Sequence, residues 1–114
     1  MLDAMPVSFE GFSKLEMKVG KIIEVEEIPQ ARKPMYKLKI DFGPALGVRQ
    51  CVGGIKEFYS KAALVGREVV AVVNLQPKSI AGVLSECMML AAFDEETISL
   101  LKPDREMPLG TKVA

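Results

Sequence analysis

The most constraining feature of this sequence is a run in which every second residue is apolar. In Tyr36–Phe42, four apolar residues alternate with Lys37, Lys39 and Asp41. A period of two places the apolar side chains on one face of a β-strand and the polar ones on the other. A Gly-Pro pair follows directly and ends the strand. The chain must therefore pack this segment into a sheet with one buried face.

Other short segments also carry strand patterns, separated by Gly and Pro. An alternating segment begins at Met17, and Gly20 in its middle predicts a bulge or a sharp bend. A helix is expected near the N-terminus and another after Ser60, a good N-cap, with Gly66 ending it. The other predicted strands are Val48–Ile55, Glu68–Leu75, Cys87–Phe93 and Thr97–Leu101, and the two predicted helices are Ser8–Leu15 and Lys61–Val65.

The order of these segments favours an all-β fold. A five-stranded Greek-key barrel with one short helix between its third and fourth strands is the plan of the OB-fold. An SH3-like barrel and a small sandwich are the alternatives. The length of 114 residues fits one domain. We therefore expect a single domain over residues 1–114, with a core at about residues 12–102 and extensions at both termini.

The residue types that are missing exclude several functions. With no His, the chain cannot form a Ser-His-Asp or Cys-His catalytic arrangement, and two Cys cannot supply the usual four zinc ligands. No pair of carboxylates has a spacing that suggests catalysis. We expect a protein that is not an enzyme and that uses no metal or cofactor, with Cys51 and Cys87 as free, partly buried thiols.

Hydropathy indicates a cytoplasmic protein with no membrane partner. The first residues, Met1–Pro6, contain an acid and no basic run, so they make a poor signal peptide. The longest uncharged apolar runs, Val69–Val73 and Cys87–Phe93, are far shorter than a spanning helix.

The net charge of zero conceals an uneven distribution. Lys14–Lys78 contains twelve basic and seven acidic residues, whereas the remaining ends contain three basic and eight acidic residues. Lys18 and Lys21 fall on the first predicted strand, and Lys37 and Lys39 on the second. A basic centre of this kind favours a polyanion such as RNA. For any single lysine, however, the solvent-facing side of a strand is the simpler explanation.

The aromatic residues restrict how RNA is recognised. Most of the five Phe fall at positions that look like core, which leaves Tyr59 and Tyr36 as candidates for base stacking. Recognition should then rest mainly on phosphates, 2′-hydroxyls and shape.

Six pieces of the sequence, in order, resemble one known family. They are Phe12–Ile22, Ile28–Gly43, Val52–Ile55, Val72–Lys78, Gly82–Ala92 and Leu100–Asp104 followed by Gly110. This order is similar to that of the tRNA-binding domains related to the C-terminal domain of methionyl-tRNA synthetase. The family includes free-standing tRNA-binding proteins and the CsaA secretion-chaperone group. The resemblance spans roughly Phe9 to Val113.

The resemblance implies an OB-fold, a homodimer whose interface includes the termini, and binding of tRNA by shape. Lys33, Lys37 and Lys78 would contact phosphates, while Asn74 and Ser85 would bond to sugar or backbone. Met88 would pack against a base or ribose, although a core position is an equal alternative. Charge placement adds four further phosphate candidates, which are Arg32, Lys18, Lys21 and Lys39.

Two roles remain open for such a domain. The first is a non-catalytic tRNA-binding protein that assists an aminoacyl-tRNA synthetase in trans. The second is a CsaA-like chaperone that binds unfolded export clients, for which the seven Met would supply adaptable apolar contacts. A third, weaker alternative is a subunit that docks on a synthetase and touches RNA little.

Overall fold

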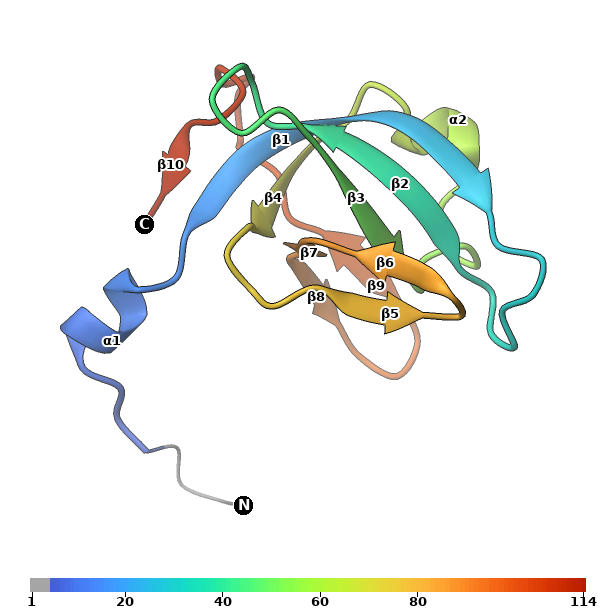
Figure 1. Ribbon diagram of the computed structural model, residues 1–114, viewed down its shortest axis with the longest axis horizontal. Helices are drawn as coiled ribbons and strands as arrows, with labels where there is room; N and C mark the ends of the chain where they lie inside the picture. Colours follow the sequence, from blue (N-terminus) through green and yellow to red (C-terminus); the bar gives the residue numbers. More distant parts are fainter. Residues whose placement is uncertain (1–4) are drawn as a thin grey trace.

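A nearly closed barrel of antiparallel strands forms the centre of the molecule (Figure 1). The computed structural model describes residues 5–114. The elements in chain order are α1 (Phe9–Ser13), β1 (Met17–Glu27), β2 (Tyr36–Asp41), β3 (Val48–Gly53), α2 (Lys61–Leu64), β4 (Glu68–Val72), β5 (Lys78–Ile80), β6 (Val83–Ser85), β7 (Met88–Met89), β8 (Ala91–Phe93), β9 (Ile98–Leu100) and β10 (Lys112–Val113).

The strand order identifies the fold. The main sheet runs β3-β2-β1-β4-β7, and β10 pairs with the start of β1. The gap between β7 and β3 is bridged just before β7, where Glu86 N donates to Gln50 O at 2.8 Å. With α2 between β3 and β4, this is the OB-fold, as predicted. The terminal extensions are α1 and the segment that ends in β10.

The alternation in β2 builds the core. Tyr36, Leu38 and Ile40 are buried, and Phe42 just beyond the strand is buried as well. Their polar neighbours Lys37, Lys39 and Asp41 point outward and are half-buried against adjacent strands. The strand therefore supplies a large part of the apolar interior on one side and three charged groups on the other.

Gly20 has a different role from the one predicted. It pairs regularly with Val69 of β4, and the register shift in β1 lies between Ile22 and Glu24. A Cβ at Gly20 would lie 2.6 Å from Ile40 Cγ2 and 2.7 Å from Phe42 Cε1. The glycine is therefore required by close packing inside the barrel, and the bulge lies further along the strand.

The segment from residue 78 to residue 93 is more divided than its pattern predicts. Lys78–Ser85 forms a hairpin, β5–β6, that the sequence did not reveal. The predicted strand Cys87–Phe93 is split at Leu90 because the chain changes partner there. Before this residue β7 pairs with β4, and after it β8 pairs with β9.

The prediction that most Phe residues belong to the core is wrong. Of the five Phe, only Phe42 is buried, and Phe93 is 79% exposed. Tyr36 is buried, and its hydroxyl donates to Tyr59 O at 2.9 Å. The hydroxyl of Tyr59 accepts from Leu100 N at 3.0 Å. Arg67 Cζ also lies over the half-buried ring of Tyr59, 5.3 Å from its centre. Both tyrosines therefore serve the fold, and one face of the Tyr59 ring is already occupied.

The N-terminal segment projects from the barrel (Figure 1). Ser8 caps α1 by accepting a hydrogen bond from Gly11 N at 2.9 Å. Part of the apolar terminus proposed for dimerisation, residues 1–4, lies outside the described residues. Within residues 5–114, no helix is both long enough and apolar enough to span a bilayer.

Candidate nucleic-acid interface

The outer face of β2 and β3 carries two of the predicted lysines. Lys37 lies opposite Val52 and Lys39 opposite Gln50 in the β2–β3 register. Directly opposed residues in an antiparallel pair share one face of the sheet. Both lysines therefore lie on the outer β2–β3 surface, where OB-folds commonly bind oligonucleotides.

Acidic residues of β1 moderate this positive face. Glu26 lies opposite Lys37, and Glu24 lies opposite Lys39. Lys37 Nζ is 3.1 Å from Glu26 Oε2, and this hydrogen bond lowers the pKa of the Glu26 carboxyl below its usual value. A phosphate that binds Lys37 must therefore compete with a carboxylate that is ionised at neutral pH.

The loop between β1 and β2 brings Arg32 and Lys33 close to the β5–β6 hairpin. Gln30 Nε2 donates to Ala81 O at the tip of the hairpin, at 3.1 Å. Arg32 and Lys33 are exposed and line a shallow depression together with Ile80 and Ala81. One hydrogen bond thus connects two segments that are far apart in sequence, and both carry predicted site residues.

A groove of about 260 Å³ gathers three more of the predicted residues, which are Lys78, Ser85 and Met88. It lies between β3, the β4–β5 loop and the β5–β6 hairpin, and we call it the lysine-rimmed groove. Its lining residues are Val52, Leu75, Gln76, Lys78, Ile80, Ser85, Glu86, Cys87 and Met88. Met88 is 49% exposed, so it is a surface residue and not part of the core.

Ser85 and Asn74 both use their polar atoms on the backbone. Ser85 Oγ accepts from Val52 N at 3.0 Å and donates to Cys87 O at 3.2 Å. Asn74 Oδ1 accepts from Glu16 N at 2.8 Å, and its Nδ2 donates to Lys14 O at 2.7 Å. These hydrogen bonds hold the hairpin to β3 and the N-terminal segment to the β4–β5 loop.

Lys18 and Lys21 lie away from these residues. Lys18 lines a groove with Lys14 and Lys112 at the start of β1. Lys21 lines another with Lys102 and the C-terminal segment. The loop that carries Lys33 follows the opposite end of the eleven-residue strand β1. The structure thus brings together Arg32, Lys33, Lys37, Lys39 and Lys78, which we call the basic face, and separates Lys18 and Lys21 from it.

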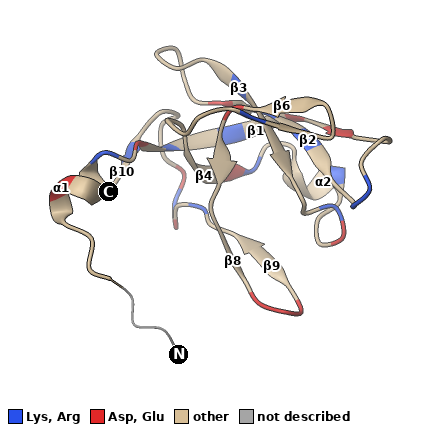
Figure 2. Cartoon of the chain, turned by 60° about the horizontal axis from the view of Figure 1, so that its bottom comes forward, with Lys and Arg blue, Asp and Glu red and all other residues tan. Residues whose placement is uncertain are grey.

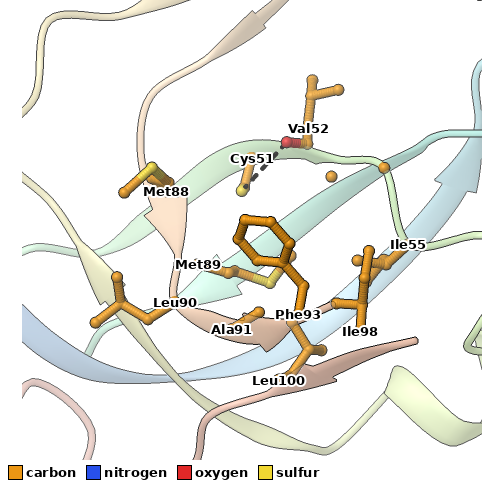
Figure 3. Close-up of a pocket in the computed structure, with 12 residues that line it drawn as sticks. Cys51, Val52, Ile55, Met88, Met89, Leu90, Ala91, Phe93, Ile98 and Leu100 are labelled. Carbon is orange, nitrogen blue, oxygen red and sulfur yellow. Dashed lines mark hydrogen bonds between the residues drawn. The ribbon is translucent and has the colours of Figure 1, made fainter. Parts of the chain in front are cut away.

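A second groove, of about 290 Å³, shares Val52 and Met88 with the lysine-rimmed groove. Figure 3 shows its lining. Phe93 lies at its centre in this view, with Met88 and Leu90 on one side and Ile55 and Ile98 on the other. We call it the apolar groove. Its rim differs from that of its neighbour, because the loop between β8 and β9 is acidic (Figure 2). That loop contains Asp94, Glu95 and Glu96.

The two cysteines are free and buried. The hydrogen bond with Cys51, together with burial, raises the pKa of the Cys87 thiol well above its usual value. A thiol held in its protonated form is a poor nucleophile. Within the described part of the chain, no group of three His, Cys, Asp or Glu side chains could hold a metal ion.

Sequence reasoning missed the apolar and acidic members of the lysine-rimmed groove. Three of them, Leu75, Gln76 and Glu86, lie within the family-like pieces of the sequence but were not predicted as contacts. They meet Ile80 only because β5 and β6 fold back as a hairpin. The one available signal was Ala81-Gly82, since Gly is favoured in two-residue hairpin turns.

The chain matches a known protein family over most of its length. The family described as "Putative tRNA binding domain" matches residues 17–112. The chain belongs to the tRNA-binding domain family. The match covers the whole barrel, the hairpin and the start of β10.

Similar sequences occur in methionine–tRNA ligases. The Thermococcus onnurineus ligase is 47% identical over 107 residues, which cover 94% of this chain. The Pyrococcus furiosus ligase is 48% identical over the same length. The chain spans only 14% of each ligase.

Solved structures of similar length share the fold. Chaperone CsaA from Bacillus anthracis superposes with a TM-score of 0.90 at 40% identity, covering 97% of this chain and all of that one. The MetRS related protein from Pyrococcus horikoshii gives a TM-score of 0.87 at 33% identity, with the same coverage.

Proposed function

We propose that this protein binds folded tRNA without catalysis, through phosphate contacts on the basic face. The observation that carries the proposal is the convergence of the β1–β2 loop, β2 and the β5–β6 hairpin, which places five basic residues around one surface. Membership of the tRNA-binding domain family supports tRNA as the ligand. Asn74 and Ser85 support this surface by holding its segments in position. The proposed compartment is the cytoplasm, where the protein would encounter tRNA.

The proposal is tested by reversing two charges on the basic face. The Lys37→Glu and Lys78→Glu double variant should bind tRNA much more weakly. The dependence of log affinity on log salt should also become shallower, by about one unit for each phosphate that the protein no longer neutralises. The measurement is a salt titration of tRNA binding, alongside thermal unfolding to confirm that the variant is folded.

A double variant with the same change in charge supplies the control. Lys102→Glu with Arg105→Glu alters the C-terminal segment, outside the basic face. This variant should bind tRNA as the wild type does. Equal weakening in both double variants would show that net charge alone governs binding, and it would rule out the basic face as the tRNA-binding surface.

We propose further that the protein supplies tRNA affinity to an aminoacyl-tRNA synthetase. The support is that methionine–tRNA ligases contain a segment 47–48% identical to it. We also propose a homodimer, supported by exposed apolar side chains on the projecting N-terminal segment. Val7 and Phe9 there are 75% and 82% exposed.

Holding of unfolded polypeptides is the second candidate function. The apolar groove and its exposed Phe93 favour it, as does the similarity to proteins described as chaperone CsaA. Suppression of the aggregation of a denatured protein, without measurable affinity for tRNA, would favour this candidate over the first.

A further inference from the structure

We propose that the lysine-rimmed groove receives the base of one unpaired nucleotide, while Lys78 binds its phosphate. The inference rests on the proposed RNA-binding function and deepens it. It adds a preference for RNA in which a base is displaced from the helix, beyond recognition of phosphates and shape.

The lining of the groove matches the two chemical parts of a nucleotide. Val52, Leu75, Ile80 and Met88 offer apolar surface to the faces of a base. Leu75 and Met88 are 40% and 49% exposed, so a ligand can reach both side chains without rearrangement of the core. Lys78 lies on the exposed strand β5 at the rim and offers an ammonium group to a phosphate.

The groove also contains polar groups suited to the edge of a base. Glu86 Oε1 accepts a hydrogen bond from Gln50 N at 2.9 Å, which leaves its other oxygen to accept from an N–H group of a base. The amide of Gln76 is exposed on the same lining and can both donate and accept. The carboxylate of Glu86 can only accept, so it requires a base with an N–H donor, whereas the amide of Gln76 can pair with a donor or an acceptor of that base.

Size and surroundings separate this groove from its neighbour. About 260 Å³ lies just below the usual range for small-molecule pockets, which suits one planar base and not a larger ligand. The groove adjoins the basic face, because its Val52 is the direct cross-strand partner of Lys37. The apolar groove has no basic lining residue within the described part of the chain, and the acidic loop 94–96 beside it would repel phosphates.

The test compares two RNA hairpins that differ by one nucleotide. One contains a single unpaired 2-aminopurine, and the other is fully paired. The wild-type protein should bind the first at least about fivefold more tightly, the lower end of the range known for base stacking on proteins. The fluorescence of 2-aminopurine should rise as the base leaves the RNA stack and enters the groove.

Variants locate the effect. The Leu75→Ala and Met88→Ala double variant should reduce the affinity ratio to about one, by weakening the binding of the hairpin with the unpaired base. Lys78→Glu should weaken binding of both hairpins. Phe93→Ala, which removes an exposed side chain of the apolar groove alone, should leave the ratio as in the wild type.

Each alternative outcome has a separate meaning. Equal binding of both hairpins by the wild type would overturn the inference and leave the proposed function standing, whereas binding of neither hairpin nor tRNA would reject the proposed function itself. A short uncharged apolar peptide is the other probe. If Leu75→Ala with Met88→Ala abolishes its binding but not the RNA preference, the groove accepts polypeptide and the inference is wrong.

Discussion

Gly20 shows how a single residue can govern the interior of the barrel. It lies in the regular part of β1, and the side chains of Ile40 and Phe42 occupy the space that a Cβ would need. Both of these side chains are buried and belong to the main core. The absence of a side chain at residue 20 therefore allows β1 and β2 to close around Phe42.

Replacing Gly20 with Ala should destabilise the protein. A methyl group with neighbours at 2.6–2.8 Å forces the core to shift, and overpacking of this kind costs about 1–3 kcal/mol. The free energy of unfolding, measured with a chemical denaturant, checks this value. Gly54→Ala is the control, because a Cβ there meets nothing within 4 Å and the expected change is within about 0.5 kcal/mol. Equal effects at both positions would contradict the packing argument.

At the same scale, sequence reasoning could not predict the contacts of individual polar side chains. Ser85 and Asn74 were predicted to bond to the sugar or backbone of RNA, whereas in the structure their polar atoms bind backbone groups of distant segments of the protein. Hydrogen bonds of this kind depend on which segments meet in space, and no local pattern encodes that. Lys37 and Lys39, by contrast, were placed on an outward face correctly by periodicity alone.

At the scale of elements, Asn74 attaches the N-terminal segment to the barrel through Lys14 and Glu16. Asn74→Ala should lower the free energy of unfolding by only about 1 kcal/mol, because water can replace both bonds. Amide hydrogen exchange at Glu16 should accelerate far more than exchange in the core. Gln76→Ala, two residues along the same exposed loop, should leave the exchange of Glu16 unchanged. Unchanged exchange in Asn74→Ala would show that this attachment does not depend on the side chain.

The elements that sequence reasoning missed are the short ones. The alternating run Tyr36–Phe42 identified β2, but β5 and β6 have three residues each, too few for a period to be recognised. The turn between them requires positive φ at both Ala81 and Gly82, and Ala gives no sign of this. The division at Leu90 arises from a change of partner strand, which is a tertiary event.

At the scale of the whole molecule, the exposed apolar N-terminal segment predicts self-association. Replacing Val7 and Phe9 with Ser should convert the proposed dimer into a monomer without lowering the stability of the barrel. Sedimentation equilibrium at micromolar concentration measures the change in mass. Phe58→Ser is a suitable control, because Phe58 is 41% exposed and lies outside the terminal segments. If the wild-type protein sediments as a monomer, the proposal of a homodimer is wrong.

Charge and fold class were both predictable at this scale, because each depends on many residues at once. Five basic residues of the basic centre of the sequence lie on the basic face, whereas Lys18 and Lys21 line other grooves. The pairing of Lys37 with Glu26 could not be anticipated, because it depends on the register between β1 and β2.

Val52 and Met88 form a wall common to the two grooves, since both residues line both of them. Methionine has three rotatable bonds, and its side chain can lean into one groove or the other but not into both. A base that packs against Met88 holds its side chain in the lysine-rimmed groove, whereas a ligand that binds Met88 in the apolar groove withdraws it from the base. Thermodynamic linkage makes this antagonism reciprocal: the factor by which an apolar ligand weakens a bound nucleotide equals the factor by which the nucleotide weakens the apolar ligand.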